Sequence, residues 1–120
     1  MEEKVRIIKG GLFDLPDKLS EEEVFEELFC GASFRVERII SSGQASPPGF
    51  WYDQKEDEWV TLLQGEAELE FEDGAVQKLK KGDWAFLPAS LQHRVAATSV
   101  DPPCIWLAIF GPPADGRNGR

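Results

Sequence analysis

Four side chains near the middle of this sequence could do chemistry together: Tyr52, Gln54, Glu58 and His93. His93 is the only histidine in the 120 residues, and an imidazole can transfer a proton near neutral pH or bind a metal ion. The other three share one face if their segment is extended, because their positions all have the same parity. A carboxylate and an imidazole brought together in this way indicate one of three roles. They catalyse proton transfer, they bind a ligand, or they form an ion pair with each other that has only a structural role.

A period of two in the hydrophobic pattern predicts β-strands around these residues. The turn sequence Asp73-Gly74 predicts a hairpin between two of them. Many short strands, interrupted by glycine and proline, favour an antiparallel sandwich or barrel. The strands are expected at 34–39, 66–72, 76–80, 84–87, 93–98 and 105–110.

One segment before these strands is predicted to be a short helix over 20–29. Ser20 and Glu23 form a capping box, and Gly31 is placed to end the helix. Apolar residues follow the cap at helical spacing, namely Val24, Phe25, Leu28 and Phe29.

These elements predict a single domain that consists of three parts. We expect an N-terminal appendage with a strand and the helix over 1–32, a β-barrel over 33–111, and a tail over 112–120.

Composition and charge exclude several classes of partner. Hydrophobic residues make up 42% of the chain and charged residues 29%, as in ordinary globular domains. The net charge of -9 argues against nucleic acid and membrane surfaces as partners, since both require positive charge. Cys30 and Cys104 lie far apart, and the N-terminus is too charged for a signal peptide. We therefore expect reduced thiols and a cytoplasmic protein.

Two stretches resemble the paired motifs of the cupin superfamily. Glu58 and Gly65 match the second half of the first motif, and Gly82, Pro88 and His93 match the second motif. The resemblance extends over roughly residues 34–110. It implies an all-β fold, an antiparallel double-stranded β-helix (jelly-roll or cupin barrel), with a pocket at the mouth of the barrel.

The first motif is degenerate at the positions that matter for metal binding. Tyr52 and Gln54 stand where the family has two histidines, so only Glu58 and His93 remain of the four usual ligands. Gln54, Glu58 and His93 would still hold a divalent ion such as zinc, nickel, manganese or iron, but less tightly than three histidines and a glutamate. The resemblance therefore implies weak or lost metal binding.

Three functions stay open on this basis. The first is a small-molecule-binding cupin for a small polar ligand, and the replacement of half the ligand set by neutral hydrogen-bonding groups favours it. The second is a metal-dependent cupin enzyme, an isomerase, dioxygenase or decarboxylase of a small polar metabolite. The third is a structural or regulatory dimer with a vestigial pocket. Fold alone does not choose among them, because one barrel hosts unrelated chemistries.

Arg38 and Trp51 are further candidates for the pocket. The strand alternation would turn Arg38 inward, where it needs an anion such as Glu58 or a bound carboxylate. Trp51 adjoins Tyr52 in a predicted rim loop, where an indole stacks on a flat ligand or packs against the barrel. Without a metal, Glu58 and His93 are expected to pair, which would favour ionised Glu58 and raise the pKa of His93.

Apolar residues on both faces of two strands predict a homodimer. A sheet that is apolar on both faces must cover the outer one. Residues 5–13 and the predicted helix would cover part of it, and a second subunit the rest, through sheet faces or swapped N-terminal strands. The residues concerned are Ile39, Ile40, Ile105, Leu107 and Ile109.

Overall fold

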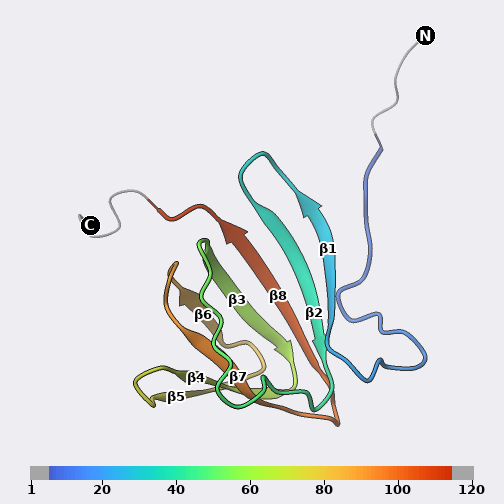
Figure 1. Ribbon diagram of the computed structural model, residues 1–120. Coiled ribbons are helices and arrows are strands. Elements are labelled where there is room, and N and C mark those ends of the chain that lie inside the picture. The colour runs from blue at the N-terminus through green and yellow to red at the C-terminus, as the bar shows by residue number, and fades with distance from the viewer. Residues whose placement is uncertain (1–5, 115–120) are drawn as a thin grey trace.

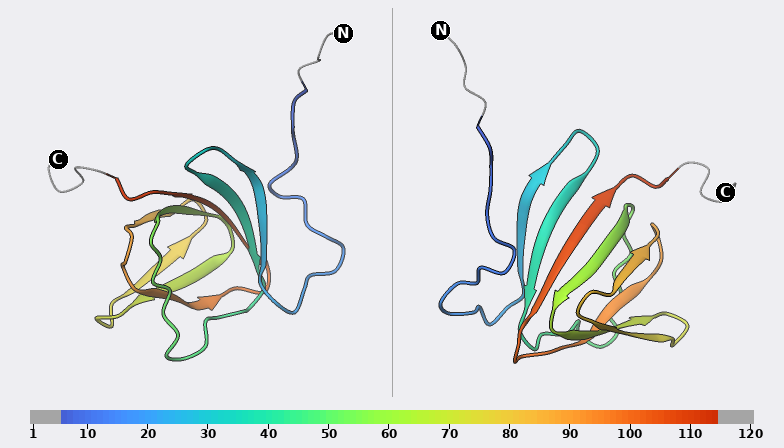
Figure 2. Two further views of the ribbon diagram at one scale, coloured as in Figure 1. Left: turned by 45° about the horizontal axis from the view of Figure 1, so that its top comes forward. Right: turned by 180° about the vertical axis from the view of Figure 1, so that it is seen from behind.

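The structure is a computed structural model that describes residues 6–114, and within that range it contains β-strands and no helix (Figure 1). A five-stranded antiparallel sheet has the order β1-β2-β8-β3-β6, and a three-stranded sheet has the order β5-β4-β7. The two sheets face each other and form a barrel (Figure 2). The strands are β1 (Val24–Cys30), β2 (Arg35–Ser41), β3 (Asp57–Gln64), β4 (Glu66–Phe71), β5 (Val76–Lys80), β6 (Trp84–Leu87), β7 (His93–Thr98) and β8 (Cys104–Gly111).

This architecture confirms the all-β antiparallel barrel and the strands expected from the alternating pattern. The predicted hairpin joins β4 to β5, with Glu66 opposite Lys80 at its open end. Asp73 accepts a hydrogen bond from the backbone of Ala75 at 2.9 Å, and Gly74 has a φ of 91°, which glycine adopts without strain. Among residues 6–114 no helix has the length and apolar character needed to cross a membrane.

The helix predicted over 20–29 is wrong, because most of that segment forms strand β1. The Ser20 hydroxyl accepts a hydrogen bond from the backbone N–H of Glu22 at 3.1 Å, but this contact closes only a local turn. β1 then pairs with β2 along its whole length, with an irregularity between Glu27 and Phe29. Pairing with the next strand along the chain therefore outweighs the local helical signal.

The predicted boundary between appendage and barrel at residue 33 falls in the turn between β1 and β2. Because β1 is an edge strand of the five-stranded sheet, Val24–Cys30 is part of the barrel's sheet in the structure. Residues 1–5 and 115–120, which include most of the predicted tail, lie outside the described residues.

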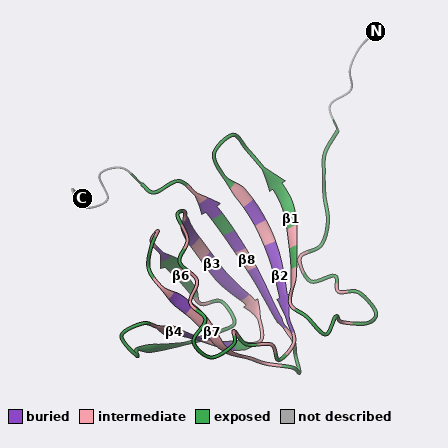
Figure 3. Cartoon of the chain, viewed as in Figure 1, coloured by how far each residue is buried: buried purple, intermediate pink, exposed green. Residues whose placement is uncertain are grey.

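The core lies between the two sheets and is centred on β3 and β8. Figure 3 shows buried residues concentrated on β2, β3 and β8, whereas β1 is largely exposed. Leu62 of β3 is completely buried. The barrel therefore has a buried centre, and its edge strands β1 and β5 are largely exposed. The buried cluster consists of Ile39, Val60, Leu62, Ala67, Leu69, Leu79, Leu87, Cys104, Trp106, Ala108 and Phe110.

Candidate functional site

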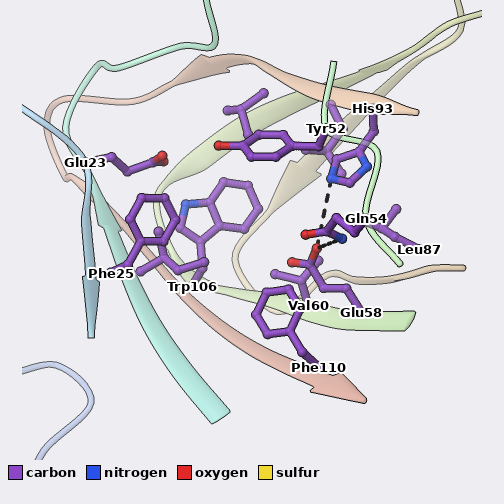
Figure 4. Close-up of a pocket in the computed structure, with 13 residues that line it drawn as sticks. Glu23, Phe25, Tyr52, Gln54, Glu58, Val60, Leu87, His93, Trp106 and Phe110 are labelled. Carbon is purple, nitrogen blue, oxygen red and sulfur yellow. Dashed lines mark hydrogen bonds and ion pairs between the residues drawn. The ribbon is translucent and has the colours of Figure 1, made fainter. Parts of the chain in front are cut away.

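A partly open cavity of about 70 Å³ lies inside the barrel, and Figure 4 shows the residues that line it. Its lining includes Tyr52, Gln54, Glu58 and His93, so the structure brings together the four polar residues singled out from the sequence. Since one water occupies roughly 10–15 Å³ on this scale, the enclosed space suits a few waters or a small organic molecule.

The backbone fixes each of these side chains. Tyr52 and His93 form an isolated bridge, in which the Tyr52 N–H donates to His93 O at 2.7 Å and the His93 N–H donates to Tyr52 O at 3.2 Å. Their rings stack with centroids 5.4 Å apart. Glu58 lies in β3 opposite Leu87 of β6 and Phe110 of β8, so strands hold its backbone on both sides.

Glu58 and His93 face each other without a direct hydrogen bond. Glu58 Oε1 lies 4.0 Å from His93 Nε2, and the two side chains are only 9% and 6% exposed. The Gln54 amide donates to Glu58 Oε1 at 3.1 Å. His93 Nδ1 lies 3.2 Å from the Leu91 carbonyl, to which it must donate, and this leaves Nε2 as a hydrogen-bond acceptor toward the cavity.

Burial shifts the pKa values of Glu58 and His93 in the directions that favour their neutral forms. Desolvation raises the pKa of Glu58 from 4.5 to about 7, although the Gln54 hydrogen bond opposes the shift. Desolvation also lowers the pKa of His93 below 6.5. The expectation that pairing would favour ionised Glu58 and raise the pKa of His93 is therefore wrong. At a separation of 4.0 Å the attraction does not offset the loss of hydration.

Arg38 lies on the opposite face of the sheet, so its predicted place in the pocket is also wrong. Ile39 faces the cavity, and side chains alternate along a strand. Arg38 instead forms an ion pair with Glu26 at 2.5 Å and donates to the carbonyls of Leu12 at 3.1 Å and Asp14 at 2.5 Å. These contacts attach the N-terminal segment to the outside of β2.

Trp51 is not among the residues that line the cavity. The indole that lines it belongs to Trp106, a buried residue of β8. Trp106 thus supplies the aromatic face that was expected from Trp51.

Sequence reasoning missed a second carboxylate in the cavity lining, that of Glu23. The Ser41 hydroxyl donates to Glu23 Oε2, and Trp106 Nε1 donates to Ser41 Oγ at 3.1 Å. Burial raises the pKa of Glu23, while the Ser41 hydrogen bond opposes the shift. Figure 4 shows this carboxylate and the Tyr52 hydroxyl pointing toward each other. The capping box predicts a helix at Glu23, so the sequence does not indicate that this residue lines the pocket.

The polar residues fit a resident metal ion poorly. Glu58 and His93 Nε2 can each offer a lone pair, but Gln54 directs its NH2 group toward Glu58. No group of three or more His, Cys, Asp or Glu that could hold an ion occurs within residues 6–114. Zinc sites in proteins use three or four such ligands. The predicted set of Gln54, Glu58 and His93 therefore supplies two strong donors and one weak one.

Comparison with known proteins agrees with this fold. Residues 37–110 match the family model of the cupin domain. An uncharacterized protein of Aquifex aeolicus (strain VF5) is 42% identical over 67 residues, which are 56% of this chain and 53% of that protein. The match therefore spans only about half the length of that relative.

Solved structures show the same similarity. A "putative mannose-6-phosphate isomerase" from Ralstonia eutropha JMP134 is 44% identical with a TM-score of 0.81, and the match covers 87% of this chain and 97% of that one. An RmlC-like cupin protein from Desulfovibrio desulfuricans is 20% identical with a TM-score of 0.65, covering 89% and 99%. The polyketide cyclase RemF from Streptomyces resistomycificus is 16% identical with a TM-score of 0.64, covering 76% and 66%. The last two similarities show the fold alone.

Proposed function

The chain belongs to the cupin family, and on that premise we propose that its cavity binds a small polar molecule through its own side chains, without a resident metal ion. The observation that carries this proposal is the 4.0 Å gap between Glu58 Oε1 and His93 Nε2, both of which belong to buried side chains. Buried polar groups are costly unless they are hydrogen-bonded.

A hydroxyl or amino group placed between these two atoms would give His93 Nε2 a hydrogen bond and Glu58 Oε1 a second one beside that from Gln54. It would donate to one and accept from the other at about 2.8 Å, which a separation of 4.0 Å allows. Protonated Glu58 can donate such a bond and His93 Nε2 can accept one, so the pair can hold a ligand group that both donates and accepts. Tyr52 and Gln54 then form the adjoining polar wall.

A metal-dependent cupin enzyme is the second candidate, and the 44% identical protein named as a "putative mannose-6-phosphate isomerase" favours it. Glu58 and His93 would hold the ion, which would polarise a bound oxygen. A phosphorylated sugar would in addition need a cationic side chain to receive its phosphate. Among the described residues no Lys or Arg lines the cavity, so the structure favours the first candidate.

Metal analysis of protein purified without chelator separates the two candidates. We expect far less than one metal ion per chain, and a melting temperature that does not change when a chelator is added. Near-stoichiometric metal that is lost in both Glu58→Ala and His93→Ala would contradict the proposal. Glu72→Ala, which removes an exposed carboxylate, is the matched control.

The homodimer is a separate proposal and rests on exposed apolar side chains at one edge of the barrel. The side chains of Phe25 and Phe29 in edge strand β1 are 54% and 53% exposed. Those of Ile7 and Ile8 in the preceding segment are 83% and 88% exposed. Apolar patches of this kind are usually covered in solution. Light scattering should give twice the mass of the chain, and a monomer at micromolar concentration would contradict the proposal.

A further inference from the structure

When Glu58 and Glu23 are ionised, the polar atoms that face the cavity are mostly acceptors. Glu58 Oε2, Glu23 Oε1 and His93 Nε2 form no hydrogen bond with any of the described residues. The Tyr52 hydroxyl is likewise without a hydrogen bond among residues 6–114, and it can donate one proton. A ligand that satisfies this set must supply several N–H or O–H groups.

The charges around the cavity favour the same kind of ligand. Of the guanidinium groups on the neighbouring strands, Arg35 lies opposite Phe110 on the same face of the sheet, 4.2 Å from the centroid of its ring. Its charge opposes the rise that burial causes in the pKa of Glu58, but it does not line the cavity and is ion-paired with Glu56 and Glu37. Arg94 points away from the cavity and is ion-paired with Glu70 at 2.6 Å. The described lining thus contains two carboxyl groups and no side chain that is permanently cationic.

The two carboxyl groups lie at opposite ends of the cavity, with apolar walls between them (Figure 4). Glu58 is next to Gln54 and His93, whereas Glu23 is held by Ser41 and lies beside Phe25. The walls between the ends include the indole of Trp106 and the side chains of Ile39 and Val60. An indole face also attracts an organic cation.

From these observations we propose that Glu23 and the Tyr52 hydroxyl form a second polar anchor, and that the cavity takes a small organic amine with another hydrogen-bond donor at its far end. The middle of the ligand is apolar and lies along Trp106. One end binds at Glu58 and His93, and the other binds at Glu23 and Tyr52. This inference rests on the proposed function, since it names the ligand class of the same cavity.

A series of four-carbon probes tests the ligand class: diaminobutane, butylamine, butanol and butyrate. Binding is followed by NMR through the His93 ring protons at one end and the Trp106 indole N–H at the other. We expect diaminobutane to bind most tightly and to shift both signals, followed by butylamine, butanol and butyrate in that order. Butyrate binding more tightly than butylamine would overturn the proposal.

Variants test the second anchor. Glu23→Gln keeps an acceptor for Ser41 but removes the charge, and should weaken diaminobutane binding about tenfold. Glu22→Gln makes the same charge change at an exposed neighbour and should leave binding unchanged. Tyr52→Phe keeps the stacking on His93 and removes only the hydroxyl, so it tests the same anchor by an independent route and should also weaken binding.

The outcomes separate this inference from the proposed function. Diaminobutane binding that is weakened by Glu58→Gln but not by Glu23→Gln or Tyr52→Phe would overturn the second anchor and leave the proposed function intact. Failure of all four probes, butanol included, to shift either reporter signal would overturn both.

Discussion

The two ends of the cavity present a carboxyl group to the same space but are built differently. Glu58 lies in β3, which is hydrogen-bonded to β6 on one side and β8 on the other. Glu23 directly precedes β1, an edge strand that pairs only with β2 within the described residues. Edge elements with few buried contacts open at lower free energy than central strands. The comparison indicates a fixed end at Glu58 and a more easily opened end at Glu23.

The largest expected effect is the difference in unfolding free energy lost when a side chain is truncated at the centre of the barrel and at its edge. Leu62→Ala should cost about 2–5 kcal/mol, because its side chain is completely buried in β3, the strand that carries Glu58. Phe25→Ala should cost about 1 kcal/mol or less, because that side chain is 54% exposed at the Glu23 end. Urea unfolding measures both values, and equal losses would contradict the distinction between the two ends.

The pH dependence of stability probes the Glu58 end. Because folding raises the pKa of Glu58 from 4.5 to about 7, the folded state favours the protonated acid. This contribution is fully present below pH 4.5 and is lost as the pH rises through 7, with a total on the order of 3 kcal/mol.

The Glu58→Gln variant should not lose this stability as the pH rises through 7. The Glu72→Gln variant, changed at an exposed position, should lose it as the wild type does. The measurement is the free energy of unfolding across that pH range for the three proteins. A wild-type stability that rises as pH increases toward 7, relative to Glu58→Gln, would contradict the buried neutral acid.

A smaller effect concerns His93. Burial lowers its pKa below 6.5, so its stability contribution is present above pH 6.5 and is lost as the pH falls through the folded pKa. Glu58 titrates at about 7 and is therefore mostly protonated where the imidazole titrates. Glu58→Gln should leave the pKa of His93 nearly unchanged. NMR titration of the ring protons checks this, and a pKa above 6.5 that falls in the variant would restore the ion-pair interpretation.

The sequence predicts the Glu58 end better than the Glu23 end, for a physical reason. The resemblance to the cupin motifs places Glu58 and His93 in the pocket, although the alternating pattern predicts no strand over the residues of β3. The state of β1 is decided by its pairing with β2, which no local pattern reveals, and the capping box at Ser20 and Glu23 indicates a helix instead.

Two further errors come from facts that only the packed structure contains. Both faces of β2 are buried, one by the cavity side and one by the N-terminal segment, so alternation alone could not decide which way Arg38 points. The depth of burial likewise decides the sign of the pKa shifts of Glu58 and His93. The sequence identifies the titratable groups, but it does not show how far folding removes each of them from water.

The proposed function requires that the cavity binds a small ligand with its own side chains and without metal. The most direct measurement is a titration of chelator-treated protein with diaminobutane, followed through the His93 ring protons. We expect a saturable shift that is the same before and after chelation. The absence of a shift with diaminobutane and with each of the other three probes, or a shift that appears only when a divalent metal is added back, would contradict it.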